Sequence, residues 1–187
     1  ERDRRLFAGL DATAAVGEGL RARSPGVDAS GMAAAFEESG REDAVARLGV
    51  EILVDLGVFL PDAVALGEKA VASDGGYWPN LRSLGEARFA AGDAEGAAEM
   101  FLLALEEAEG GNGRGEMQRG TAWTRLHLGK ALEACGERAG ALRRLGEAAA
   151  LSDVVFDWIE RDRALEELRK DLRYPEAMAR AREVFGE

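Results

Sequence analysis

The sequence predicts an all-α protein built from antiparallel helix pairs. Apolar residues recur at helical spacing along almost the whole chain, which is the main sign of amphipathic helices. Alanine is abundant, only four prolines occur, and β-branched runs are almost limited to "VEILV" and "VV". Gly57, Gly92 and Gly136 each follow a helical segment, and they are 35 and 44 residues apart. Short connections of this kind place consecutive helices antiparallel.

Turn residues divide the N-terminal part of the chain into four helices. "SPG" ends the first and Gly40 the second, and Pro61 suits the first turn of the fourth. The expected helices cover about residues 3–23, 28–40, 42–56 and 61–73. The stripe expected to face the core in the third helix consists of Ala44, Leu48, Ile52 and Leu56.

The rest of the chain follows the same rule. Pro79 begins a helix that Gly92 ends, and Asp93 is expected to cap the next helix. Four glycines in "GGNGRG" (110–115) then interrupt the chain, and Asp153 is expected to cap a later short helix. The expected helices cover about residues 79–91, 94–109, 116–135, 138–151, 154–173 with one break, and 175–185.

Two stretches of this part repeat one another. Residues 84–97 read "LGEARFAAGDAEGA", and residues 128–141 read "LGKALEACGERAGA". The leucines are expected to fill the seam within a helix pair, the glycines beside them to let two helices approach closely, and each Gly-acidic pair to end one helix before the next. The repeat positions are Leu84, Gly85, Gly92, Ala97 and Phe101 in one unit, and Leu128, Gly129, Gly136 and Ala141 in the other.

This pattern resembles that of tetratricopeptide repeats, whose period is near 34 residues with two helices in each unit. The likeness covers repeats over 78–109 and 116–151 and a degraded repeat over 42–73, with divergent helices over 1–41. Two features depart from the family: Arg88 and Leu132 replace the aromatic residue of the first helix, and the unit-ending proline is absent. The resemblance implies one domain over 1–187, a right-handed α-solenoid with a concave groove for a peptide or protein.

The C-terminal segment over 152–187 is expected to cap the array. "DWIERDRALEELRKDLRY" (157–174) is similar to the ending of many tetratricopeptide arrays, with Leu172 in place of a proline. The matching residues are Trp158, Ile159, Leu168, Arg169, Asp171, Arg173 and Tyr174.

The resemblance also assigns the residues that would contact a partner, because specified positions of each first helix line the groove. These residues are Arg82, Glu86, Phe89, Trp123, Leu126, His127, Lys130 and Glu133. Trp123 either anchors a partner or is buried between repeats, and His127 is either a contact or an ordinary surface residue. Arg82 and Glu86 do not reproduce the Lys and Asn with which some family members grip chaperone C-termini.

The charge of the chain is unevenly distributed. Of the net charge of −11, the whole excess lies in residues 37–110, which carry sixteen acidic and five basic side chains. Such a field disfavours nucleic acid and anionic membranes as partners. It either attracts a basic protein partner or forms a solvated surface.

Nothing in the sequence indicates catalysis. The chain has one histidine and one cysteine, which excludes a Cys-based zinc site and a disulfide within the chain. A phosphate-binding loop follows a β-strand, whereas no strand is expected before "GGNGRG". We therefore expect a non-enzymatic, cytoplasmic protein-interaction module without metal or cofactor. Two alternatives stay open: a regulatory or scaffolding segment of a larger signalling or processing protein, which the missing initiator Met favours, and a self-associating module that forms homo-oligomers.

Overall fold

The computed structural model describes residues 42–110 and 116–185, and the helices expected before residue 42 lie outside these ranges. Within them the chain forms ten α-helices and one 3-10 helix, with no strand, so the described part is all-α. The chain divides into two compact units, Glu1–Asp93 and Ala94–Glu187, each of which is described by itself. Their boundary lies inside the repeat expected over 78–109. No helix in the described ranges is long and apolar enough to cross a membrane.

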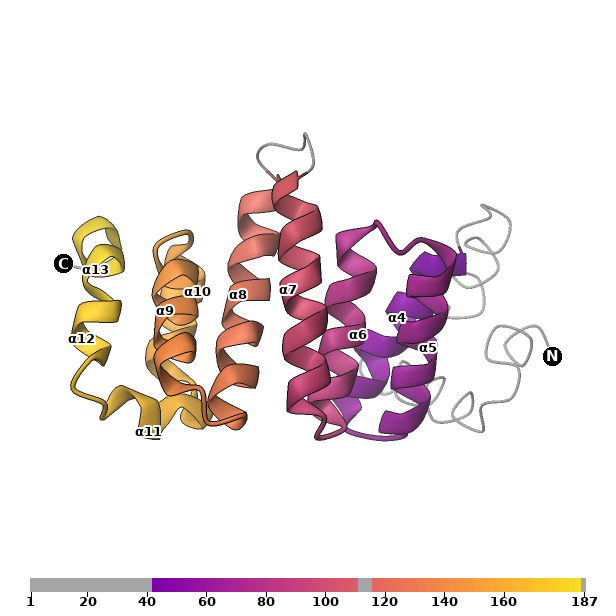
Figure 1. The fold of residues 1–187 in the computed structure, drawn as a ribbon, viewed down its shortest axis with the longest axis horizontal. Helices are drawn as coiled ribbons and strands as arrows, with labels where there is room; N and C mark the ends of the chain where they lie inside the picture. Colours follow the sequence, from indigo (N-terminus) through magenta and orange to yellow (C-terminus); the bar gives the residue numbers. More distant parts are fainter. Residues whose placement is uncertain (1–41, 111–115, 186–187) are drawn as a thin grey trace, which may run out of the picture. The chain divides into compact units, whose positions relative to one another are not determined.

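The first unit contains α4 (Glu42–Leu56), α5 (Leu60–Ser73) and α6 (Trp78–Ala90). In Figure 1, α5 runs beside both other helices, and α4 also contacts α6. The stripe predicted for α4 is wrong by one to two positions. Ala46, Val50 and Leu53 are buried, whereas Leu48, Ile52 and Leu56 are only half-buried. Apolar residues occur on more than one side of this helix, so periodicity alone did not identify the side that faces α5.

Asn80 of α6 links this helix to α4 and to the C-terminal end of α5. Its buried side-chain amide donates hydrogen bonds to the carbonyl oxygens of Ala70 and Asp74, both at 3.1 Å. Its carbonyl oxygen accepts a hydrogen bond at 3.2 Å from Arg47 of α4, whose guanidinium also lies 5.3 Å from the ring centre of Tyr77. The α5–α6 turn is therefore held through a single buried polar side chain.

The three turn glycines have the same local structure. Gly57, Gly92 and Gly136 have positive φ angles of 65°, 88° and 82°, which glycine adopts without the strain caused by a side chain. In the turn at Gly92, the Gly92 N–H donates to the Phe89 carbonyl and the Asp93 N–H to the Arg88 carbonyl. The other two turns form the equivalent bonds. Each helix therefore ends in a Schellman motif, which satisfies its last carbonyl groups.

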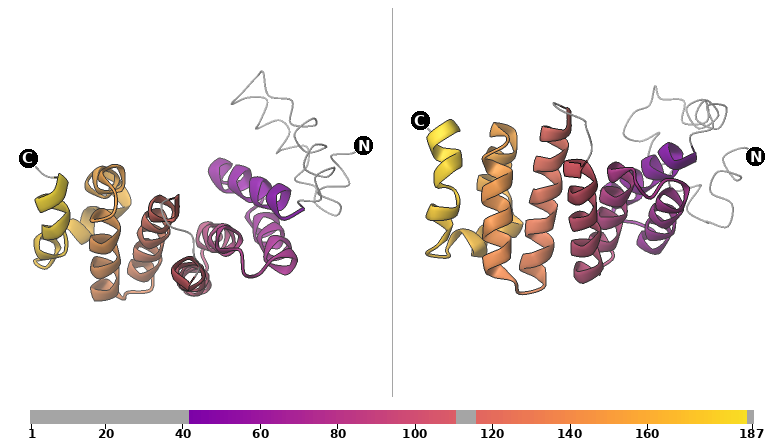
Figure 2. Two further views of the ribbon diagram at one scale, coloured as in Figure 1. Left: turned by 90° about the horizontal axis from the view of Figure 1, so that it is seen from above. Right: turned by 45° about the horizontal axis from the view of Figure 1, so that its top comes forward.

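The second unit begins with three long helices, α7 (Ala94–Gly110), α8 (Glu116–Ala134) and α9 (Arg138–Ala149). Shorter elements follow: α10 (Asp153–Arg161), η1 (Arg163–Leu165), α11 (Glu166–Arg169), α12 (Tyr174–Ala177) and α13 (Ala179–Phe185). Helix α8 contacts α7, α9 and α10, and α9 also contacts α12 and α13. Figure 2 shows α13 and α9 side by side.

Two glycines allow helices of the second unit to approach closely. A Cβ atom on Gly129 of α8 would lie 2.8 Å from Leu145 of α9, and one on Gly146 would lie 2.3 Å from the Ala177 carbonyl oxygen. The repeat positions of both units are buried: Leu84 in the first unit, and Ala97, Phe101, Leu128 and Ala141 in the second, are each at most 3% exposed. Gly85 is also buried. Small residues thus set how closely these helices pack.

Candidate protein-interaction surface

A group of aromatic and charged side chains from α8, from α10 and from the C-cap residue of α10 lies on one side of the second unit. We call it the tryptophan surface, and its residues are Trp123, His127, Lys130, Trp158 and Asp162. The three residues of α8 are spaced i, i+4 and i+7, so they share one face of the helix. Since α8 contacts α10, this face meets Trp158 and Asp162, which are four residues apart.

The two tryptophans contact each other edge to face. Their ring centres are 5.8 Å apart with an interplanar angle of 76°, an arrangement that the charge distribution of aromatic rings favours. The Lys130 ammonium lies 5.9 Å from the Trp158 ring centre and 2.9 Å from an oxygen of Asp162. Although held by both contacts, Trp158 is still 49% exposed, while Trp123 is half-buried. The surface therefore presents an ordered indole to the outside.

Local hydrogen bonds hold Asp162 at the end of α10. Its carboxylate accepts a hydrogen bond at 2.9 Å from the Ala164 N–H, so Asp162 is also the N-cap of η1. Arg169 donates at 2.8 Å to the backbone carbonyls of both Ile159 and Asp162. Burial acts to raise the pKa of Asp162, but hydrogen bonds from Lys130 and Ala164 outweigh it and lower the pKa. At the other end of α10 the N-cap is Ser152, whose hydroxyl accepts from the Val155 N–H, and not the expected Asp153.

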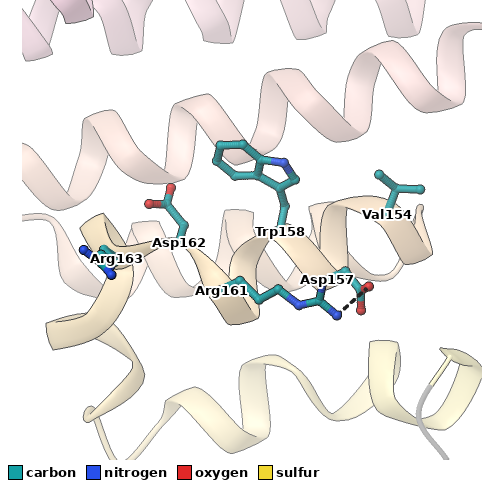
Figure 3. Close-up of a pocket in the computed structure, with 6 residues that line it drawn as sticks. All are labelled: Val154, Asp157, Trp158, Arg161, Asp162 and Arg163. Carbon is teal, nitrogen blue, oxygen red and sulfur yellow. Dashed lines mark ion pairs between the residues drawn. The ribbon is translucent and has the colours of Figure 1, made fainter.

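A cavity of about 580 Å³ lies along α10 beside Trp158. Its lining consists of Val154, Asp157, Trp158, Arg161, Asp162 and Arg163. Figure 3 shows Trp158 and Asp162 on one side of the helix, and Asp157 and Arg161 paired on another at 3.3 Å. An apolar wall with charges at its edge suits a peptide side chain.

His127 continues the aromatic contacts toward α7. Its ring lies 5.7 Å from that of Phe101, stacked at 25°, and 6.5 Å from that of Trp123. Phe101 is fully buried, so the histidine joins the core to the tryptophan surface.

The three predicted contact residues of the first unit all lie on α6. Arg82 and Glu86 form an ion pair at 3.2 Å, and the Arg82 guanidinium lies 5.7 Å from the Trp78 ring centre. Burial raises the pKa of Glu86; Arg82 lowers it in part, and Glu51 and Asp55 raise it further. Phe89 is half-buried. This part of α6 therefore carries a partly buried ion pair and two aromatic side chains, with carboxylates of α4 acting on Glu86.

Two residues predicted to contact a partner have other roles. Leu126 is 1% exposed and packs in the core, so it does not line an open surface as expected. It is one position before His127, and a step of about 100° around the helix turns it into the core of the second unit. Glu133 pairs with Arg138 across the α8–α9 turn, at 3.0 Å between Nε and Oε1.

The sequence pattern does not predict Trp158 and Asp162 as contact residues, because it assigns Trp158 only to the end cap. The signal that could have found it is the spacing, since Trp158 follows Trp123 by 35 residues, close to one repeat. Among the described residues, no group of three or more His, Cys, Asp or Glu residues could hold a metal ion.

Comparison with known proteins identifies no relative of this chain. No protein-family model matches the sequence, and neither the curated proteins nor the solved structures contain a match.

Proposed function

We propose that this protein is a non-enzymatic interaction module, a right-handed solenoid of tetratricopeptide-like helix pairs that binds a peptide or protein segment. Three observations support stacked pairs: identical Schellman turns, contacts of α4 with α6, and contacts of α8 with α10. In stacked pairs the first helices of successive units pack side by side, and so do the second helices. The contacts of α9 with α12 and α13 agree with this arrangement.

The observation that carries the proposal is the exposure of Trp158. A side chain that is 49% exposed, yet fixed by Trp123 and Lys130 beside a cavity of about 580 Å³, is preorganised for contact. Tryptophan is enriched among the residues that dominate binding energy at protein interfaces. A rigid anchor of this kind loses little conformational entropy when a partner binds.

The test uses peptides selected from a random library on the immobilised protein. Their affinity for the wild type and for Trp158→Ala is measured by titration. We expect the variant to lose about 2 kcal/mol or more of binding free energy. Leu172→Ala is the matched control, because Leu172 is 96% exposed and lies outside the tryptophan surface. Equal binding of the selected peptides to wild type and Trp158→Ala would refute the proposed site.

The acidic residues of the first unit extend the proposal to the charge of the partner. Glu51 and Asp55 both act on Glu86, so carboxylates gather around this side of α4 and α6. A basic segment would relieve their repulsion. Binding of such a partner should weaken steeply with salt, whereas salt-independent binding would contradict a basic partner.

Self-association is the second candidate, and the C-terminal helix favours it. Val184 and Phe185 are 59% and 37% exposed at the end of α13. Repeat arrays need polar terminal faces to remain monomeric. Sedimentation velocity over a wide concentration range distinguishes a self-associating protein from a monomer. It is measured on the wild type and on the double variant Val184→Glu, Phe185→Ser. A dimer in the wild type alone supports self-association, and a concentration-independent monomer excludes it.

A further inference from the structure

A second cavity of the second unit contains mainly charged residues. Its volume is about 600 Å³, and we call it the arginine cavity. Its charged residues are Glu109, Arg125, Arg143, Arg144, Glu147 and Arg180. Arg125 is two residues beyond Trp123 on α8, a rotation of about 200° around the helix, so the cavity and the tryptophan surface use opposite faces of α8.

The positive charges in the arginine cavity outnumber the negative ones. Four guanidinium groups face two carboxylates. Glu109 pairs with Arg125, and Glu147 pairs with Arg125 at 3.5 Å and with Arg144 at 2.9 Å. Within residues 42–110 and 116–185, Arg143 and Arg180 have no ion-pair partner, so two positive charges are left without a matching carboxylate. This is notable in a chain whose net charge is −11.

One arginine of the cavity also has an unused buried donor. The Nε atom of Arg144 is buried and has no hydrogen-bond partner among the described residues. Buried donors in folded proteins are nearly always paired with an acceptor. An anion in the cavity would supply the missing acceptor.

The backbone around the cavity is shaped by Gly146. A Cβ atom at this position would lie 2.3 Å from the carbonyl oxygen of Ala177, so α9 and α12 meet directly, and both residues line the cavity. This contact joins the helix that carries Arg143 and Arg144 to the segment that leads into Arg180 of α13. The backbones that carry Arg143, Arg144 and Arg180 are therefore helices packed against each other and not a loop.

We propose that the arginine cavity binds a phosphate group. A phosphate ester carries a charge of about −1.5 to −2 at neutral pH, which matches the two unpaired guanidinium charges. A single carboxylate would neutralise only half of this excess. The planar forks of Arg143, Arg144 and Arg180 suit the several acceptor oxygens of phosphate. The phosphate is supplied either by a free small molecule or by a phosphorylated side chain of a partner.

The test titrates the ¹⁵N-labelled whole chain with sodium phosphate at constant ionic strength and follows the arginine Nε–H resonances. We expect saturable shifts at Arg144, where the Nε–H gains its acceptor. The double variant Arg143→Gln and Arg180→Gln should weaken binding about tenfold or more, since charge-assisted hydrogen bonds are lost. Both side chains lack an ion-pair partner within the described part of the chain, so their replacement is expected to leave the fold intact.

Arg182→Gln is the control, because Arg182 lies on the same helix but pairs with Glu160 at 3.2 Å. It should bind phosphate like the wild type. Shifts that do not saturate, an unaffected double variant, or equal weakening by Arg182→Gln would each overturn the proposal. A matched pair of serine and phosphoserine peptides identifies the source. Tighter binding of the phosphopeptide than of free phosphate indicates a phosphorylated partner, and the reverse order indicates a small phosphate.

Discussion

Lys130 of α8 and Asp162 at the end of α10 form an ion pair at 2.9 Å, and the same ammonium lies 5.9 Å from the Trp158 ring centre. The pair joins two helices whose residues are 32 positions apart in sequence. Its side chains are 19% and 12% exposed, so water screens it only in part. Lys130 thereby sets the position of the indole that the proposed function requires.

A double-mutant cycle on this pair should give a coupling energy of about 1–2 kcal/mol, above the value for exposed pairs and below that for buried ones. The variants are Lys130→Met, Asp162→Asn and the double replacement, measured by urea unfolding. The matched control is the Arg161–Asp157 pair on α10, which is 80% and 63% exposed and should couple by less than about 0.5 kcal/mol. Equal coupling in the two cycles would contradict the role given to Lys130.

The same pair should affect stability at acid pH. Because the pKa of Asp162 in the folded state lies below its ordinary value of 3.8, the ionised carboxylate stabilises the fold above pH 3.8. This contribution is lost as the pH falls through the folded-state pKa. The difference in unfolding free energy between wild type and Lys130→Met should therefore shrink on acidification. Carboxyl ¹³C titrations should show a higher pKa of Asp162 in the variant.

Replacement of glycine by alanine should have opposite effects at positions that look alike in sequence. Gly129→Ala would place a Cβ atom 2.8 Å from Leu145, and such overpacking should cost about 1–3 kcal/mol. Gly140→Ala has its nearest neighbour at 3.4 Å, so it should be neutral or stabilise by up to about 1 kcal/mol through helix propensity. Thermal unfolding of both variants tests this, and a stabilised Gly129→Ala would disprove the close approach of α8 and α9.

Asn80→Ala should destabilise the first unit by about 1–3 kcal/mol, because the Ala70 and Asp74 carbonyls lose their side-chain donor. Asn80→Asp retains the size of the side chain but removes both donated hydrogen bonds, so it should destabilise at least as much. Hydrogen exchange should show faster opening of α5 and α6 in both variants. Unchanged exchange would mean that water satisfies these carbonyls equally well.

Glu86 should make the first unit less stable as the pH rises. Burial raises its pKa above 4.5, so the folded state binds more protons than the unfolded state between pH 4.5 and the raised value. Relative to Glu86→Gln, the wild type should therefore lose stability with rising pH across that window. Denaturant unfolding from pH 4.5 to pH 7.5 checks the sign. The effect should persist at high salt because burial, its largest cause, is not screened.

Helix ends in the first unit could be predicted closely from the sequence. Expected boundaries at 42–56, 61–73 and 79–91 compare with Glu42–Leu56, Leu60–Ser73 and Trp78–Ala90 in the structure. The reason is local: a glycine with positive φ and the two hydrogen bonds of a Schellman motif involve only neighbouring residues. The segments expected over 154–173, with one break, and over 175–185 instead form the shorter elements α10, η1, α11, α12 and α13.

The tryptophan surface could be predicted only in part. Trp123 and Lys130 were expected to contact a partner, whereas Trp158 and Asp162 reach them from 35 and 32 residues away. Capping and turn patterns involve only neighbouring residues, so they do not predict that α8 contacts α10. A step of one residue also decides between the core and the surface, as Leu126 and His127 illustrate.

From the amino-acid sequence one can tell that the described chain is helical and where the helices up to α9 end, because helical periodicity and glycine turns act over a few residues. The tertiary structure sets which face of each helix is buried. It also brought Trp158 to Trp123 and left Arg143 and Arg180 without carboxylate partners in the described part of the chain. These features depend on how helices far apart in the sequence pack, and that packing is set by the summed contacts of many side chains.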